Sequence, residues 1–233
     1  MATSAMGKRL EGKTIVITGA SSGIGRSTAI EFARTSPNNL RLILTARRID
    51  TLKQVAADIT KQVGEGVKVL PFQLDVSKPK EVSSFVGNLP EEWRGIDILV
   101  NNAWVCLSLF AWVGTDTRHS RGLVRGVARA PDIAAEDMNI QFATNVTGLI
   151  NMTQAVLPIF KKREEGGRGD IINIGSIAGR EPYAGGSIYC ATKAAVKSFT
   201  DALRKELITT RIRVIEIDPG QVKTVRFSSC RIL

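Results

Sequence analysis

A glycine-rich turn placed directly after the first apolar segment limits the fold of this chain more than any other feature. Residues 14–18 read Thr-Ile-Val-Ile-Thr, which is typical of a short buried strand, and Gly-Ala-Ser-Ser-Gly-Ile-Gly follows at residues 19–25. A helical pattern then runs from Ile24 to about Thr35. Such a turn directs backbone N–H groups and a helix N-terminus toward a phosphate. We therefore expect the chain to begin with the strand–turn–helix unit of a nucleotide-binding α/β fold.

The rest of the chain alternates short apolar, β-branched segments with helical segments. This alternation predicts a parallel sheet covered by helices on both faces. A closed barrel of the same alternation needs eight strands and usually binds phosphate late in the chain, so we favour a single-domain, doubly wound, Rossmann-like sheet. We expect strands at 41–45, 68–74, 96–100, 170–174 and 212–217, and helices at 50–63, 82–89, 135–161 and from 187 onward, with Asp50 and Ser187 as helix caps.

Composition argues against several classes of function. The 233 residues carry a net charge of +10, but the lysines and arginines are spread along the chain without interleaved aromatic residues, so we expect no nucleic acid partner. No apolar run reaches transmembrane length and residues 1–13 are polar and basic, so we expect neither a membrane span nor a signal peptide. Three cysteines without disulfide or metal spacing indicate a reducing, cytoplasmic location, and a single histidine argues against a metal site.

A second candidate site is the stretch from Ser176 to Lys193. Ser176 follows an expected buried strand and should lie at the carboxyl edge of the sheet, where open α/β sheets bind ligands. Tyr189 and Lys193 are four residues apart on the next helix and are therefore neighbours on one face. A phenol has a pKa of about 10 in water, and a nearby cation favours the phenolate, which makes a tyrosine usable as a general acid and base. Such a pair is also common on ordinary helices, so its meaning depends on a cofactor site elsewhere.

The end of the second expected strand favours NADP(H) over NAD(H). A site that prefers NAD places a carboxylate there for the ribose, whereas this chain has Arg47 and Arg48 and no acid before Asp50. Arginine suits a 2′-phosphate, and Arg26 beside the glycine turn adds positive charge. The alternative is that Arg47 and Arg48 are surface residues that precede a helix.

In this order and at these spacings, the motifs resemble those of the short-chain dehydrogenase/reductase family. The stretch from Pro182 to Val196 is most similar to the NADP-dependent 3-hydroxy acid, serine and allo-threonine dehydrogenases. The resemblance implies an oxidoreductase that transfers a hydride between NADP(H) and a short hydroxy acid or a related alcohol or carbonyl compound, without a metal. It runs from about Gly12 to Thr224 and rests on Thr18-Gly-x-x-x-Gly-Ile-Gly25, Asp75-Val76, Asn101-Asn102-Ala103, Asn145 and the Ser176/Tyr189/Lys193 set.

The resemblance also implies a role for each matched residue. Tyr189 is expected to exchange the proton at the substrate oxygen, and Lys193 to lower the pKa of Tyr189 and bond the nicotinamide ribose. Ser176 is expected to polarise the substrate, and Asn145 to support a water in the proton relay. The adenine is expected at Asp75, the ribose at Asn102 and Ala103, and the nicotinamide under the residues from Pro219 onward. The full set expected to bind the cofactor is Thr18, Gly19, Ser21, Ser22, Gly23, Ile24, Gly25, Arg26, Arg47, Arg48, Asp75, Val76, Asn102, Ala103, Tyr189, Lys193, Pro219, Gly220, Val222 and Thr224.

The first departure from the family pattern is an atypical segment at residues 104–121. The family has glycine after Asn101-Asn102-Ala103, whereas this chain has Trp104, and deleting the eighteen residues restores that glycine through Gly122. We interpret the segment as an insertion, either an intron retained in frame or a genuine lid or partner-binding loop. Transcript reads that always contain the segment would contradict the intron hypothesis.

The second departure is a shortened C-terminus. After Gly220 the family continues through a substrate-covering lobe, a seventh strand and a final helix, so we expect strand 212–217 to form an exposed edge. Two hypotheses therefore stand: an active oxidoreductase, and a catalytically impaired or inactive variant, mis-processed or truncated, with a binding role at most. We expect a homodimer through helix 135–161 and the helix that carries Tyr189, but no tetramer, because tetramer contacts need the seventh strand.

Overall fold

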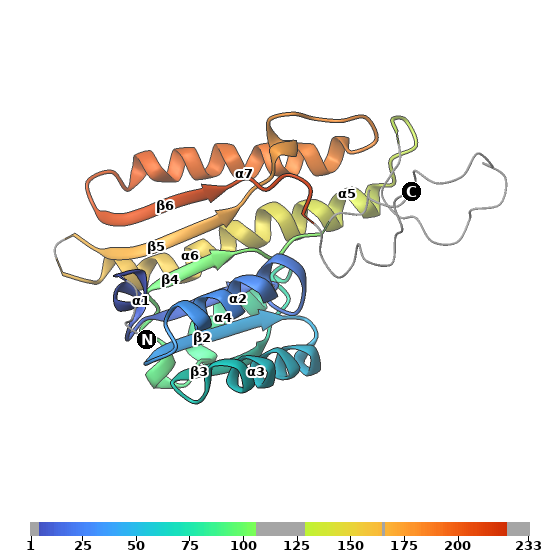
Figure 1. The fold of residues 1–233 in the computed structure, drawn as a ribbon. Coiled ribbons are helices and arrows are strands. Elements are labelled where there is room, and N and C mark those ends of the chain that lie inside the picture. The colour runs from blue at the N-terminus through green and yellow to red at the C-terminus, as the bar shows by residue number, and fades with distance from the viewer. Residues whose placement is uncertain (1–4, 106–128, 165, 223–233) are drawn as a thin grey trace.

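The chain folds as strands that alternate with helices, as a computed structural model shows for residues 5–105, 129–164 and 166–222 (Figure 1). The strands are β1 (Thr14–Thr18), β2 (Leu40–Ala46), β3 (Val67–Gln73), β4 (Ile98–Asn101), β5 (Arg168–Ile174) and β6 (Arg211–Ile217). The helices are α1 (Ala5–Leu10), α2 (Gly23–Thr35), α3 (Ile49–Val63), α4 (Pro79–Asn88), α5 (Ala135–Phe142), α6 (Leu149–Lys161) and α7 (Ser187–Glu206), with short turns η1 (Glu91–Trp93), η2 (Ala143–Gly148) and η3 (Ile177–Gly179).

All strands of the sheet are parallel, in the order β3–β2–β1–β4–β5–β6. The chain starts in the middle with β1, moves outward to β3, returns to the middle at β4 and then moves outward to β6. The predicted doubly wound sheet is therefore confirmed. From β1 the chain continues to β2 on one side, and from β4 it continues to β5 on the other side. The edge between β1 and β4 is the point at which such sheets form a ligand crevice.

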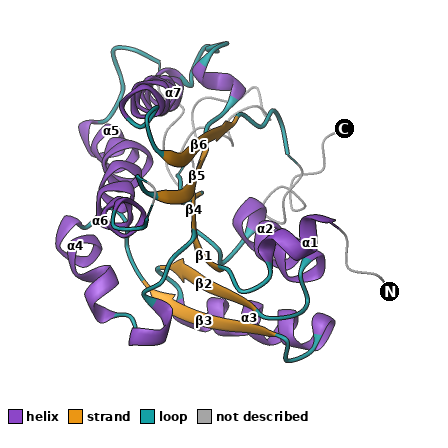
Figure 2. Ribbon diagram, turned by 90° about the vertical axis from the view of Figure 1, so that its left-hand side faces the viewer, coloured by secondary structure: helices purple, strands orange, loops and turns teal. Residues whose placement is uncertain are grey.

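Helices cover both faces of the sheet and bury one apolar cluster on each (Figure 2). On one face, α4, α6 and α7 pack through side chains such as Phe85, Val156 and Leu203. On the other, α2 and α3 pack through side chains such as Ala33 and Ile59. Strands buried on both faces need apolar side chains at nearly every position, and all five residues of β1 are buried.

The long helix predicted at residues 135–161 is present but is interrupted by a π-helical turn at η2. Such turns occur often at functional sites. Here the turn contains the buried Asn145, a predicted site residue. Gly148 ends the turn, and a Cβ at Gly148 would come within 2.8 Å of the Val76 carbonyl oxygen. The helix therefore packs directly against the chain segment that follows β3.

A row of buried polar side chains joins the strands to the helices in the middle of this layer. Asn101 on β4 donates to Thr153 of α6 and to Asn173 of β5, both at 3.0 Å. Asn173 donates in turn to Thr200 of α7 at 2.9 Å. A buried amide is costly unless it is hydrogen-bonded, so these contacts fix the positions of the helices relative to the strand ends.

Two predicted helix caps are wrong. Helix α3 begins at Ile49 with Arg48 at the capping position, and Asp50 lies in the first turn, where a negative charge still favours the helix N-terminus. Helix α7 begins at Ser187 itself, after Gly186. Helix α3 therefore starts two residues earlier than a cap at Asp50 would place it, and helix α7 starts one residue earlier than a cap at Ser187 would place it.

Within the described residues, β6 is an outer strand of the sheet, as the sequence predicts. Ile217 at its end is 48% exposed. Among the described helices, none is both long and apolar enough to cross a bilayer.

Candidate active site

The candidate site lies at the carboxyl edge of the sheet, between the ends of β1 and β4. Thr18 Oγ1 accepts hydrogen bonds from the backbone N–H groups of Asn102 and Ala103, both at 2.9 Å. The Asn102 side chain donates back to the Thr18 carbonyl oxygen at 2.9 Å. Thr18 and Asn102 are both buried. Their side chains therefore hold the two strand ends together and support the glycine turn above them.

The glycine turn after β1 has the backbone geometry that the sequence predicts. Gly19 and Gly23 have φ angles of 67° and 56°, in the left-handed region that favours glycine. Helix α2 starts at Gly23, and no described side chain caps it at Ser22. Its first N–H groups therefore lack acceptors within the helix. This arrangement fits a pyrophosphate, with Ser21 to Gly25 around it.

The three arginines predicted near this turn take different positions. Arg48 Nη2 donates to Ser21 Oγ at 3.1 Å, so its guanidinium lies over the turn. Arg26 forms an ion pair with Asp58 of α3 at 2.9 Å. The Arg47 side chain is exposed. Within the described part of the chain no carboxylate pairs with Arg48, so this guanidinium fits an anionic group such as a 2′-phosphate.

Asp75 and Val76 follow β3 at the same carboxyl edge of the sheet. Asp75 accepts hydrogen bonds from the Ser77 backbone at 3.0 Å and the Ser77 hydroxyl at 2.7 Å. Val76 is buried against Gly148, in the turn that contains Asn145. The structure thus places these two predicted cofactor residues at the sheet edge.

Tyr189 and Lys193 lie together on the first turns of α7. Their exposed fractions are 9% and 2%, and Lys193 Nζ is 5.8 Å from the centre of the Tyr189 ring. Lys193 Nζ also donates to the Ile174 carbonyl oxygen at 2.8 Å. Ile174 is the last residue of β5, so this bond ties the helix to the strand end that precedes Ser176.

Asn145 joins the same group through a residue that sequence reasoning missed. Its side chain donates to Thr192 Oγ1 at 3.1 Å, and Thr192 donates to the Tyr189 carbonyl oxygen at 2.7 Å. The other contacts of Asn145 are to the backbone of Val105, at 2.8 and 2.9 Å. Thr192 lies inside the Tyr-x-x-x-Lys pattern, and only its position one residue before Lys193 could have drawn attention to it.

Ser176 is held at the start of η3, directly against α7. Its Oγ accepts a hydrogen bond from the Ala178 N–H at 3.2 Å. Gly179 allows this turn to pack on the backbone of the helix, because a Cβ there would lie 2.8 Å from the Lys193 carbonyl carbon. The structure therefore brings Ser176, Asn145, Tyr189 and Lys193 into one region, whereas their catalytic roles stay predictions.

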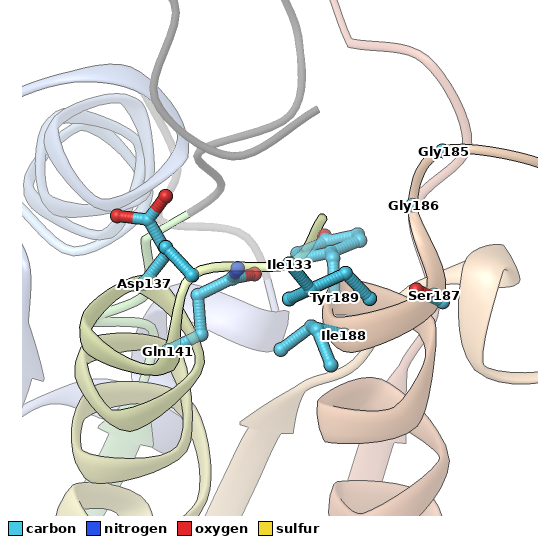
Figure 3. Close-up of a pocket in the computed structure, with 9 residues that line it drawn as sticks. Ile133, Asp137, Gln141, Gly185, Gly186, Ser187, Ile188 and Tyr189 are labelled. Carbon is cyan, nitrogen blue, oxygen red and sulfur yellow. The ribbon is translucent and has the colours of Figure 1, made fainter. Parts of the chain in front are cut away.

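A pocket opens beside Tyr189, between α5 and the start of α7 (Figure 3). Gln141 and Asp137 line it from α5, and Ser187 and Ile188 line it from α7. Gln141 is 2% exposed, and its Oε1 has no hydrogen-bond partner among the described residues. This side chain, one helical turn before Asn145, is a polar group that sequence reasoning did not identify.

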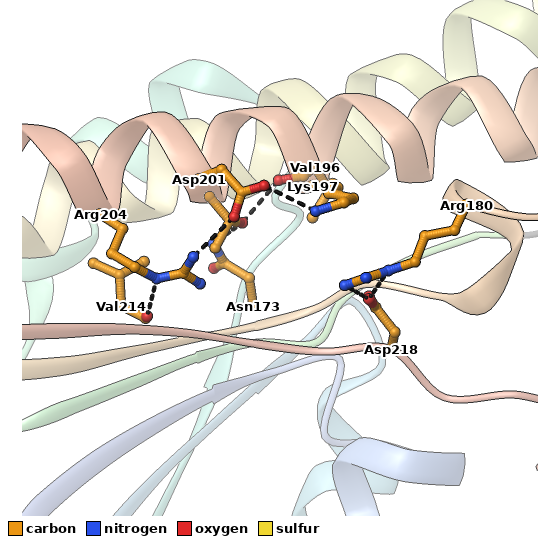
Figure 4. A network of polar contacts seen from close by, with 9 residues as sticks. Asn173, Arg180, Val196, Lys197, Asp201, Arg204, Val214 and Asp218 are labelled. Atoms are coloured by element: carbon orange, nitrogen blue, oxygen red, sulfur yellow. Dashed lines mark hydrogen bonds and ion pairs between the residues drawn. The ribbon is translucent and has the colours of Figure 1, made fainter.

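The carboxylates of Glu216 and Asp218 lie next to Gly175, near the end of β6. Burial raises the pKa of the Glu216 carboxyl, and the neighbouring Asp218 carboxylate raises it further. Asp218 also forms an ion pair with Arg180 at 2.7 Å (Figure 4). A Cβ at Gly175 would collide with the Asp218 carboxylate. This glycine therefore lets the two acids approach the strand end that leads to Ser176.

The predicted nicotinamide residues at the C-terminal side are described only in part. The Pro219 carbonyl oxygen accepts a hydrogen bond from the Ile177 N–H at 3.2 Å, so this segment lies beside η3. Gly220 and Val222 are exposed, and Val222 is 41% exposed. Thr224 lies outside the described residues, as does most of the interpreted insertion after Val105.

The comparisons with known proteins agree with this geometry. A model of the short chain dehydrogenase family matches residues 13–231. The NADP-dependent 3-hydroxy acid dehydrogenase of Schizosaccharomyces pombe is 47% identical over 216 residues, which are 93% of this chain and 74% of that protein. The closed form of serine dehydrogenase complexed with NADP+ has a TM-score of 0.72 and 36% identity, covering 90% of this chain and 73% of that one. A short-chain dehydrogenase from Sphingobium yanoikuyae in complex with NADPH has a TM-score of 0.73 and 33% identity, with coverage of 93% and 74%.

Proposed function

This chain belongs to the short-chain dehydrogenase family and uses NADP(H), and we propose that it transfers a hydride between that cofactor and a short hydroxy acid or a related alcohol or carbonyl compound. The observation that carries the proposal is the buried series of contacts that joins Asn145, Thr192, Tyr189 and Lys193 beside Ser176. The substrate class is supported by the relatives, which are named as 3-hydroxy acid and serine dehydrogenases.

The residues around the crevice suit the parts of NADP(H). The uncapped N-terminus of α2 and the glycine turn would hold the pyrophosphate, and Arg48 would hold the 2′-phosphate. Asp75 and Val76 would lie at the adenine, while Asn102 and Ala103 would lie at a ribose. When bound, the cofactor supplies or accepts the hydride.

We assign the proton chemistry to Tyr189, with Lys193 and Ser176 as its partners. The Lys193 ammonium lies 5.8 Å from the phenol ring and would favour the phenolate form. The Ser176 oxygen accepts one N–H, which leaves the hydroxyl proton for donation to a substrate oxygen. Asn145 would position the turn that supports this group, and the water that the family resemblance implies would complete the relay.

The proposal is tested by mixing the purified chain with NADP+ and each of 3-hydroxypropionate, L-serine and L-allo-threonine. We expect NADPH to form with at least one of them. Folded protein that binds NADPH but oxidises none of the three would contradict the substrate class and leave only the family assignment.

Arg48→Ala should weaken NADPH binding about tenfold or more, because one charge-assisted contact to a phosphate is lost. NADH binding should change little, since NADH lacks the 2′-phosphate. Titration of each nucleotide into the variant measures both dissociation constants. Arg47→Ala is the matched comparison: the sequence predicts that it also weakens NADPH binding, and we expect a smaller effect than that of Arg48→Ala, because Arg48 is the arginine whose guanidinium lies on Ser21 of the turn. An equal loss of NADH affinity in Arg48→Ala would contradict the phosphate assignment.

The second candidate function is a catalytically impaired variant that retains the fold. The observation that favours it is Trp104, which stands where the family has glycine and packs against Tyr189. NADPH fluorescence on mixing separates the two candidates. A folded circular-dichroism spectrum without fluorescence enhancement would support the impaired variant.

The predicted homodimer through α5, α6 and α7 also belongs to this proposal. Met138 and Phe142 lie one turn apart on helix α5 with exposed fractions of 37% and 36%, which suits a helix face that a second copy covers. We expect sedimentation velocity to give the mass of a dimer, and a monomer at micromolar concentration would contradict it.

A further inference from the structure

The Trp104 side chain lies against the two residues that the proposed chemistry depends on most. The centre of its ring is 5.9 Å from the centre of the Tyr189 ring, with the planes inclined by 50°. Lys193 Nζ lies 5.6 Å from the Trp104 ring centre, slightly closer than the 5.8 Å to the Tyr189 ring centre. One ammonium group therefore contacts two aromatic rings, in the geometry of a cation–π interaction.

Hydrogen bonds hold the backbone on both sides of Trp104, so the position of this residue is well defined. On one side, the Ala103 N–H donates to Thr18 Oγ1 at 2.9 Å. On the other, the backbone N–H and carbonyl of Val105 both bond to the buried Asn145 side chain. The indole is partly buried and packs on the cluster of Ala178, Tyr189 and Cys190.

The same space is needed by the cofactor. In the proposed function, Lys193 bonds the nicotinamide ribose and Tyr189 acts beside the nicotinamide, so the polar atoms of both side chains must face that half of the cofactor. The Arg48 end of the crevice, at the glycine turn, is formed by other elements, namely β1, α2 and the segment after β2. An indole over Lys193 and Tyr189 therefore competes with one half of the cofactor only.

We propose that the Trp104 indole occupies the nicotinamide half of the NADP(H) site, so that this chain binds the adenine half without hindrance and the nicotinamide half only after the indole turns away. The inference rests on the proposed function, because it takes the roles of Lys193 and Tyr189 from it. Displacing the ring costs its cation–π contact and its aromatic contact, which together lower the affinity for NADPH about tenfold or more.

The experiment compares two ligands on the full chain and on Trp104→Gly. NADPH contains both halves of the cofactor, whereas adenosine 2′,5′-bisphosphate contains only the adenine half with its 2′-phosphate. Calorimetric titration should show the dissociation constant for NADPH falling about tenfold or more in Trp104→Gly, with the constant for adenosine 2′,5′-bisphosphate unchanged. Trp104→Ala should give the same pattern. This second variant excludes the added backbone freedom of glycine as the cause of the change.

Two controls make the comparison specific. Trp104→Phe keeps an aromatic face over Lys193 and should keep most of the hindrance. Trp93→Phe changes a tryptophan in the core, 9% exposed and away from the site, and should leave both constants as they are.

The outcomes separate the inference from the proposed function. Unchanged NADPH affinity in folded Trp104→Gly and Trp104→Ala would overturn the inference while leaving the cofactor site intact, as would an equal gain for both ligands. If neither ligand binds any of the folded proteins, the proposed site fails and the inference fails with it.

Discussion

In Tyr189→Phe, kcat should fall by about 10²–10⁴-fold, because the variant removes the hydroxyl that is proposed to exchange a proton with the substrate oxygen. The ring itself remains and keeps its contacts with Trp104 and Lys193, so the dissociation constant for NADPH should change far less than kcat. Steady-state rates and a nucleotide titration on the same preparation measure the two quantities. A large loss of kcat with retained binding is the signature of an interaction made mainly in the transition state.

The chain offers a matched control for this substitution in its other tyrosine, Tyr183. Tyr183 lies six residues before Tyr189, is 44% exposed, and packs beside Gly186. Tyr183→Phe removes the same atom from a position outside the proposed site and should retain the activity of the parent chain. Turnover that survives in Tyr189→Phe, or that is lost equally in Tyr183→Phe, would refute the proposed proton chemistry.

The fold follows from the sequence to a large extent, because the central strands of this sheet are buried on both faces. β1 and β5 therefore appear as apolar, β-branched runs, and the predicted bounds differ from the observed ones by a few residues at most. The alternation of elements predicts a doubly wound sheet, but the order of its strands is set by packing between distant segments. The π-helical turn around Asn145 has no signal in the sequence, since it adds one residue to a turn without changing the apolar pattern.

The candidate site follows from the sequence only where residues are close along the chain. Tyr189 and Lys193 are i and i+4 on one helix, so their proximity is predictable. Arg48 contacts Ser21, and Trp104 contacts Lys193. Each pair joins residues that are far apart in the sequence, so no local pattern indicates these contacts. The sequence could mark Trp104 as a departure from a family pattern, but it could not indicate that the indole ring packs against the Tyr189 ring.

Gly25, the third glycine of the turn, also has contacts with a distant segment that the sequence does not indicate. Replacing it should have a large effect on stability. Gly25→Ala should lower the free energy of unfolding by about 2–3 kcal/mol, at the upper end of the usual range for an added methyl group. A Cβ at Gly25 would lie 2.6 Å from the Gly19 carbonyl oxygen and would collide with the Asn102 side-chain nitrogen. Asn102 uses that nitrogen to hold Thr18, and the Gly19 oxygen is backbone, so neither neighbour moves at low cost. Thermal unfolding should show a fall of about 5–10 °C in Tm.

Gly87→Ala makes the same chemical change, but we expect it to raise the free energy of unfolding. Gly87 lies in helix α4, and a Cβ there would meet no described atom within 4 Å. Alanine lowers the conformational entropy of the unfolded chain and favours the helix, so this variant should be more stable by about 0.5–1 kcal/mol. NADPH affinity should fall in Gly25→Ala, because the displaced Asn102 no longer supports the turn that would bind the pyrophosphate, and should stay unchanged in Gly87→Ala. If Gly25→Ala were as stable as Gly87→Ala, the close packing of helix α2 on the end of β4 would not be what this glycine provides.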